Sequence, residues 1–319
     1  MAQTESRRTR EKAVYIVDAA RTPFLKARTG PGPFAAADLA VQAGRDLLAR
    51  MPFDPPELDH VVLGSTMPSP DEANIGRVAA LRLGCGDAVP AYTVMRNCAS
   101  GMQAIDSGAN LIKLEQADLV LAGGADAMSH APILWSAPMA KMLAGLMAAK
   151  SVPAKLKAVA ALRPGHLKPV IALLRGLTDP VVGLNMGQTA EVLAERFAIT
   201  RDDMDEFAVR SHKRLAAAQQ RGQLPGVTTL YPSSGRLVEH DDGVRLDSSV
   251  ENLAKLKPVF DREFGLVTAG NSSQITDGAA WVLLASEQAV KDHDLDVLAR
   301  IVDSQWAALD PRQMGLGPV

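Results

Sequence analysis

The order of apolar and polar positions predicts β-strands that alternate with α-helices over the first part of the chain. Apolar runs that end in polar residues or glycine, as buried strands do, lie at 13–22, 58–66, 90–97 and 117–129. Segments with apolar residues at helical spacing lie between them, at 36–50, 74–84 and 100–116. Because the strands are apolar on both faces, the pattern predicts an α/β fold with a largely parallel sheet covered by helices.

A different pattern occupies residues 127–178, which contain no Asp or Glu. Its seven cations are Lys141, Lys150, Lys155, Lys157, Arg163, Lys168 and Arg175. Pro153, Pro164 and Pro169 interrupt it, so it predicts short basic amphipathic helices joined by loops and inserted into the α/β core. Two helices are predicted over 187–222, and the αβ pattern resumes at 265–290.

The two ends of the chain give weaker patterns. Residues 1–12 are polar and are expected to be a flexible, solvated tail, and the apolar run after them is too short for a signal sequence or a membrane span. The segment 300–307 echoes 15–22, and predicts a strand that opens a second half-domain near residue 297. The tail 310–319 shows no capped or packed ending and is predicted to be a linker.

Composition and charge narrow the class of protein. The 319 residues are 47% hydrophobic and 22% charged, which is typical of a soluble globular protein, and we expect a cytoplasmic one. A net charge of −2 argues against nucleic acid as a partner. The two cysteines form neither a disulfide scaffold nor a zinc pattern, so a reducing compartment is expected and no metal site is predicted.

Cys98, in "VMRNCASGMQ", is the candidate nucleophile. It follows a predicted strand and precedes a predicted helix, whose N-terminal N–H groups and dipole would stabilise a thiolate. The small residues at 99–101 would let a substrate and a second backbone approach the sulfur, and the Cys98 amide could donate to an oxyanion. Position alone favours the alternative, a buried structural cysteine. Cys85, in a turn after a helix, is predicted to be structural.

The segment 94–132 resembles the active-site segment of the thiolase family, in which the cysteine of Asn-Cys-Ala-Ser-Gly takes up the acyl group. Segments at 17–24, 186–219 and 268–287 resemble other parts of that family, and 167–191 is most similar to the beta subunits of fatty-acid oxidation trifunctional complexes and their bacterial relatives. The resemblance implies a thiolase-like fold with a mixed, mostly parallel sheet in an N-terminal domain over 13–287. It also implies a mostly helical loop domain inserted at about 131–273, and a truncated second domain that starts at 288–319.

The resemblance also implies the chemistry. Cys98 would attack the keto carbon of a 3-ketoacyl-CoA in fatty-acid β-oxidation, acetyl-CoA would leave, and the acyl group would pass to coenzyme A, a substrate and not a permanently bound cofactor. Ser273 is implied to contact the pantetheine arm, with Ala269 beside it. Arg245 is implied near the adenine end and Met186 in the acyl pocket. The residues alone indicate instead that Met186 packs in the hydrophobic core and that Arg245 is a solvent-exposed charge in a loop. Asn185 stands where short-chain biosynthetic thiolases have a His, which favours a degradative enzyme.

Some family motifs are absent from the 319 residues. The family's second half supplies an Asn-Glu-Ala-Phe motif, a Gly-His-Pro motif and a second catalytic Cys, and His166 in "PGHLKP" is only superficially similar. We therefore expect this chain alone to be a poor catalyst. Two alternatives stay open: a non-catalytic acyl-CoA-binding or complex-forming protein, and a biosynthetic acetoacetyl-CoA thiolase.

The family further implies a homo-oligomer and, for the trifunctional branch, a hydratase/dehydrogenase partner subunit. The basic segment 127–178 has three interpretations: it faces the CoA phosphates, it makes peripheral contact with a membrane or a partner subunit, or it is a solvated cover for the active site.

Overall fold

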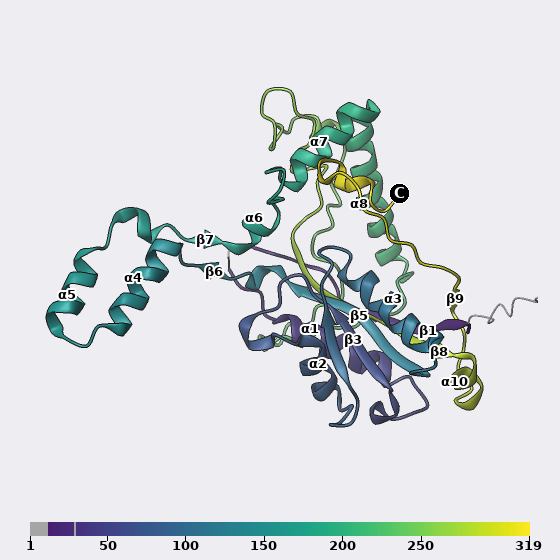
Figure 1. Cartoon of the computed structure of the whole chain (residues 1–319). Coiled ribbons are helices and arrows are strands. Elements are labelled where there is room, and N and C mark those ends of the chain that lie inside the picture. Colours follow the sequence, from purple (N-terminus) through teal and green to yellow (C-terminus); the bar gives the residue numbers. More distant parts are fainter. Residues whose placement is uncertain (1–11, 29) are drawn as a thin grey trace, which may run out of the picture. The chain divides into compact units, whose positions relative to one another are not determined.

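The computed structural model describes residues 12–28 and 30–319, so the predicted tail at 1–12 lies, apart from Lys12, outside the described residues (Figure 1). The chain forms two compact units. The first comprises Met1–His130, Asp202–Leu256 and Gly270–Ala307, and the second comprises Ala131–Arg201, Lys257–Ala269 and Ala308–Val319.

A mixed β-sheet forms the centre of the first unit. Its seven strands are β1 (Val14–Arg21), β2 (Leu25–Lys26), β3 (His60–Gly64), β4 (Ala91–Val94), β5 (Leu119–Ala127), β8 (Thr276–Ser286) and β9 (Ala299–Ile301). They lie in the order β4-β3-β5-β8-β1-β9, with β2 beside β8. β3 is parallel to β4 and β5, whereas β8 is antiparallel to both β5 and β1. The strands β4, β3, β5 and β1 therefore run in one direction, and the expected mostly parallel, mixed sheet is confirmed.

Helices cover both faces of this sheet. Helices α1 (Ala36–Leu48) and α2 (Ile75–Leu83) lie on one face, and α3 (Ser100–Lys113) lies on the other. The first unit also contains α8 (Arg201–Gln220), α9 (Val250–Leu253) and α10 (Glu287–Asp292), with 3-10 helices η1 (Pro55–Glu57), η2 (Pro70–Glu72) and η3 (Met128–His130). Leu63 and Leu121 pack in the same core as α1 and α2, whereas their neighbours Val62 and Val120 pack in a second core with α3. Successive strand residues point to opposite faces, so this alternation explains why the strands read as apolar throughout.

Trp281 on β8 is the largest side chain of the first core, and only 1% of it is exposed. Its indole Nε1–H donates to the carbonyl oxygen of Ala40 on α1 at 2.8 Å. The ring therefore buries its apolar surface and satisfies its one polar group at once, which ties α1 to the sheet. Truncation of such a residue to Ala costs about 3–5 kcal/mol.

Residues 131–178 of the basic segment lie in the second unit. They contain β6 (Ile133–Leu134), α4 (Ala137–Ala148), α5 (Val152–Ala160), η4 (Pro164–Leu167), β7 (Val170–Ile171) and α6 (Ala172–Gly176). The short helices joined by loops are thus confirmed, and the antiparallel pair β6–β7 was not predicted. α7 (Met186–Phe197) follows, and its start is held by a capping box in which Asn185 and Gln188 exchange hydrogen bonds, both of 3.0 Å.

The end of the chain differs from the prediction. Residues 310–319 are not an uncapped linker, because Pro311–Leu316 form the 3-10 helix η5, and the Asp310 carboxylate accepts from the Arg312 amide at 3.0 Å. η5 packs on α7, where Leu193 Cδ1 lies 2.7 Å from the position that a Cβ on Gly315 would occupy. An Asp before a Pro is a helix-start signal, and the expectation overlooked it. The strand expected within 300–307 is present as β9, which pairs antiparallel with β1.

Among the residues that the structure describes, no helix is both long enough and apolar enough to cross a membrane.

Candidate active site

Cys98 lies in a tight turn between β4 and α3, and its side chain is exposed. Asn97 has a positive φ of 46°, in the left-handed region, which reverses the chain just before the cysteine. The Ser100 hydroxyl holds the turn closed, because it accepts from the Arg96 amide at 2.8 Å and donates to the Asn97 carbonyl at 2.6 Å. A buried structural cysteine, which position alone favoured, is therefore wrong for Cys98.

Three glycines set the distance between this turn and the sheet. A Cβ on Gly64, the last residue of β3, would lie 2.3 Å from the backbone carbonyl carbon of Ser100. A Cβ on Gly124 in β5 would lie 3.2 Å from the Cα of Gly101 in the first turn of α3. The helix start therefore rests directly on strand backbone, while the predicted approach of a substrate and a second backbone to the Cys98 sulfur stays a prediction.

The start of α3 also determines the electrostatics around Cys98. The N-cap residue is Ala99, which has no polar side chain to cap the helix, so the positive end of the helix dipole faces the turn. Arg96 adds a positive charge two residues before the thiol. Its guanidinium carbon lies 3.9 Å from the centroid of the Trp306 ring, and the Trp306 indole donates to Asp106 on α3 at 3.1 Å. The turn that carries Cys98 therefore combines the positive end of the helix dipole with the charge of Arg96.

Cys85 has the opposite environment. It is 1% exposed, and burial raises the pKa of its thiol to about 11. The Cys85 thiol therefore stays protonated at neutral pH, and its predicted structural role is confirmed.

The loop that carries Arg245 is fixed at two places in the first unit. Asp241 accepts from Arg21 Nη1 and Nη2 at 2.7 and 2.9 Å and from the Phe24 amide at 2.7 Å. Further along, the Arg245 amide donates to Nδ1 of His212 on α8 at 3.3 Å. Burial, and then the Arg245 charge, lower the pKa of His212, so its ring is neutral at pH 7 and can accept this bond. The Arg245 side chain itself is exposed.

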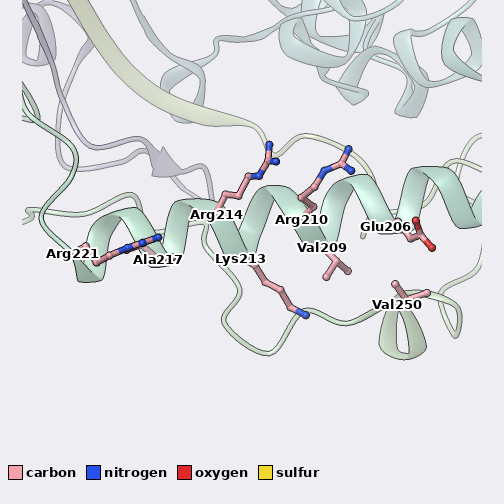
Figure 2. Close-up of a pocket in the computed structure, with 8 residues that line it drawn as sticks. All are labelled: Glu206, Val209, Arg210, Lys213, Arg214, Ala217, Arg221 and Val250. Carbon is pink, nitrogen blue, oxygen red and sulfur yellow. The ribbon is translucent and has the colours of Figure 1, made fainter.

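The same helix borders a cavity of about 430 Å³ (Figure 2). Its lining residues are Glu206, Val209, Arg210, Lys213, Arg214 and Ala217 on α8, Arg221 directly after that helix, and Val250 on α9. The lining therefore carries four cations and one carboxylate, and this net positive charge makes the cavity suited to anions. These residues were missed at the sequence level, although their spacing of three and four positions places them on adjoining faces of one helix.

Ser273 lies in the first unit, on the exposed segment that leads into β8. Its neighbour Gln274 donates to the Gly243 carbonyl at 2.6 Å, and Asn271 donates to Asp205 on α8 at 2.9 Å. The Ser273 segment and the Arg245 loop are therefore in contact with each other, and each of them also contacts α8. Met186, half-buried at the start of α7, and Ala269, which is exposed, lie in the second unit.

The α/β core, with its exposed cysteine at the start of a helix, has the thiolase fold. Residues 14–288 match the family described as "Thiolase, N-terminal domain". The chain belongs to the thiolase family, and the resemblance seen in its sequence is confirmed.

Named relatives agree with this assignment. The chain is 36% identical to the mitochondrial trifunctional enzyme subunit beta of Bos taurus over 322 residues, which cover 99% of the chain and 67% of that protein. It is 36% identical to the 3-ketoacyl-CoA thiolase of Vibrio cholerae over 321 residues, which cover 100% of the chain and 73% of that protein.

Solved structures share the fold. The crystal structure of human mitochondrial 3-ketoacyl-CoA thiolase in complex with CoA matches 96% of the chain and 73% of its own chain, with a TM-score of 0.83 and 33% identity. The Bacillus anthracis acetyl-CoA acetyltransferase matches 96% of the chain and 74% of its own, with a TM-score of 0.82 and 35% identity.

Proposed function

We propose that the chain carries the acyl-accepting site of a 3-ketoacyl-CoA thiolase, with Cys98 as the nucleophile. The single observation that carries the proposal is the exposed thiol at the start of α3, which three glycines hold against the sheet. The substrate class follows the names of the Vibrio cholerae and human relatives.

The proposed reaction has two steps. The Cys98 thiolate forms a bond to the C3 carbonyl carbon of the 3-ketoacyl-CoA, and the C2–C3 bond then breaks. Its electron pair stays on C2, which takes up a proton and leaves as acetyl-CoA. The thiolate of a second CoA attacks the Cys98 thioester, so that the shortened acyl-CoA leaves and the Cys98 thiolate is regenerated. Backbone amides at the start of α3 stabilise the oxyanion in both steps.

The proton at C2 needs a general acid, and such a group contributes roughly 10²- to 10⁴-fold in rate. The 319 residues contain neither the family's Gly-His-Pro motif nor a third Cys. We therefore expect the 319 residues alone to acylate Cys98 but to turn over slowly.

Coenzyme A is proposed to lie along the elements that meet at α8. Arg245 and the cavity cations Arg210 and Lys213 would bind its phosphates. Ser273, with Ala269, would contact the pantetheine arm, and Met186 would line the acyl pocket, as the family resemblance implies. Support for the phosphate part comes from the charge of the cavity and from the contact of the Arg245 loop with α8.

Trapping of the acyl-enzyme tests the proposal. The chain is incubated with acetoacetyl-CoA, quenched in acid and analysed by peptide mass spectrometry, with Cys85→Ala and Cys98→Ala as paired variants. We expect an acetyl thioester on Cys98 in the unmodified chain and in Cys85→Ala. CoA binding without any adduct would instead support the alternative of a non-catalytic acyl-CoA-binding protein.

A further inference from the structure

The segment that follows β9, defined here as residues 302–307 and called the strap, is fixed on α3. Two of its side chains bind one carboxylate of that helix. The Ser304 hydroxyl donates to Asp106 Oδ1, and the Trp306 indole donates to Asp106 Oδ2 at 3.1 Å. Trp306 and Asp106 are 200 positions apart in the chain, and both lie in the first unit. The strap is therefore held on the helix that begins directly after the Cys98 turn.

Trp306 provides a flat surface for the Arg96 side chain. The guanidinium carbon of Arg96 lies 3.9 Å from the centroid of the ring, which is a close cation–π contact. The Arg96 backbone is held as well, because its amide donates to the Ser100 hydroxyl at 2.8 Å and its carbonyl accepts from the Ala99 amide at 3.0 Å. Arg96 is therefore fixed at both ends, its backbone by the Cys98 turn and its guanidinium by the strap.

The charge of Arg96 is not neutralised by an ion pair. In the part of the chain that the structure describes, no Asp or Glu pairs with Arg96, and its guanidinium N–H groups make no hydrogen bond. The carboxylate that shares Trp306 with it, Asp106, accepts the hydrogen bonds of the strap instead. Arg96 stands two positions before Cys98 in the same turn, and both residues are exposed. A reactant that reaches the thiol therefore meets an unpaired positive charge.

We propose that Trp306 is a positioning residue, which holds the Arg96 guanidinium at the Cys98 turn so that its charge attracts anionic reactants to the thiol. Without the ring, the long Arg96 side chain would occupy several rotamers and its charge would spread over a larger volume. The natural reactant rests on the proposed function: it is the thiolate of the second CoA, which approaches the Cys98 thioester as an anion. A strap that only covered α3 would change stability but would not make the thiol prefer anions.

Two alkylating reagents of different charge test the proposal on the full chain. Iodoacetate is an anion and iodoacetamide is neutral, and each forms an S–C bond to the Cys98 thiolate while iodide leaves. Peptide mass spectrometry gives both rate constants at one pH and at low salt, where charge effects are least screened. The ratio of the two rate constants cancels the accessibility of the thiol and its thiolate fraction, so that it reports the local charge alone.

The variants separate the charge from the ring. Arg96→Gln removes the charge, Trp306→Ala removes the ring, and Trp306→Phe keeps a ring but loses the indole N–H. One control is Arg236→Gln, which changes the net charge by the same amount at an exposed position in a loop. The other is Trp135→Ala, which removes a Trp that is 56% exposed in the second unit. Circular dichroism checks that all variants are folded.

We expect the ratio of iodoacetate to iodoacetamide rate constants to fall roughly threefold in Arg96→Gln, the effect of one unit charge about 6 Å away in water. Trp306→Ala should lower the ratio to a similar extent, and Trp306→Phe should keep most of it. The double variant Arg96→Gln with Trp306→Ala should be no lower than Arg96→Gln, because the ring acts through the charge. Both controls should keep the ratio of the unmodified chain.

An unchanged ratio in Arg96→Gln would overturn the proposal, as would an unchanged ratio in Trp306→Ala. An equal fall in Arg236→Gln would also overturn it, because the charge would then act from anywhere on the surface. Neither reagent needs acyl transfer, so the outcome is independent of the proposed reaction. The expected pattern in a chain that forms no acyl-enzyme would support the role of Trp306 and count against the proposed function.

Discussion

Arg21 and Asp241, which are 220 positions apart, form a two-point ion pair with N–O distances of 2.7 and 2.9 Å. The pair joins the end of β1 to the loop that carries Arg245, and the Asp241 side chain is only 8% exposed. The first strand of the chain therefore holds a loop that we assign to CoA binding, although neither residue of the pair is expected to touch the ligand.

Replacement of this pair should destabilise the protein. Asp241→Asn keeps the size of the side chain and removes a charged acceptor that three N–H groups use, so we expect a loss of about 1.5–3 kcal/mol in the free energy of unfolding, measured with urea. The matched control is Asp242→Asn, whose partner Arg28 is 66% exposed, and which should cost about 0–1 kcal/mol. Equal losses in the two variants would contradict the assigned role of Arg21.

The same pair predicts a dependence of stability on pH. Burial alone would raise the pKa of Asp241, but the hydrogen bonds and charge of Arg21 and the Phe24 amide outweigh it and lower that pKa. A depressed pKa in the folded state means that the contribution is fully present above the unfolded value of 3.8 and is lost as the pH falls below it. The difference in stability between the unmodified chain and Asp241→Asn should therefore shrink below about pH 4.

The two cysteines should differ in reactivity. Iodoacetamide at pH 8 should alkylate Cys98, which is exposed, and should spare Cys85, whose pKa is about 11, until the chain is unfolded. Peptide mass spectrometry at successive times measures both rates in one sample. Comparable rates for the two thiols in the folded chain would contradict the environments described for them.

The contact between Gly64 and α3 predicts a large effect from one methyl group. Gly64→Ala would force backbone apart, because its Cβ would lie 2.3 Å from Ser100, and we expect a loss of about 1–3 kcal/mol together with slower alkylation of Cys98. Gly145→Ala is the control, since a Cβ there meets nothing within 4 Å and the residue lies inside α4. It should stabilise the chain by about 0.5–1 kcal/mol. Thermal unfolding compares the two.

Charge reversal in the α8 cavity should weaken the binding of CoA. Arg210→Glu with Lys213→Glu removes two of the four cations, and we expect roughly a tenfold rise in Kd, because exposed ion pairs contribute about 0.2–1 kcal/mol each. Calorimetry at low and high salt measures the Kd for CoA. The unmodified chain should lose more affinity for CoA at high salt than the variant does. An unchanged Kd would remove α8 from the CoA site.

Most helices and strands followed from apolar periodicity, but the direction of β8 did not. Its partners β1 and β5 lie far earlier in the chain, and a periodic pattern carries no information on which strands pair or in which direction. The end of the chain was misread because Asp310 and Pro311 stand among residues with no apolar periodicity.

In the candidate site, too, some features could be predicted from the sequence and others depend on tertiary packing. The sequence correctly predicted that Cys98 lies between a strand and a helix. The exposure of Cys98 and the burial of Cys85 depend on tertiary packing, which the residues next to each cysteine do not indicate. The cations of α8 have regular spacing, but most charged stripes on helices are solvated faces. Val250 on α9, which is distant in sequence but lines the same space, marks this stripe as the border of a cavity.

Because Gly64 packs against Ser100, the Cys98 thiol is correctly presented only when β3 is in its native register. A slip of β3 by one position would place Leu63 or Ser65 beneath the start of α3, where no side chain fits. Molecules with a misaligned sheet would then keep their secondary structure but lose a correctly presented thiol. The rate of Cys98 alkylation during refolding would therefore report when the central strands have found their native alignment.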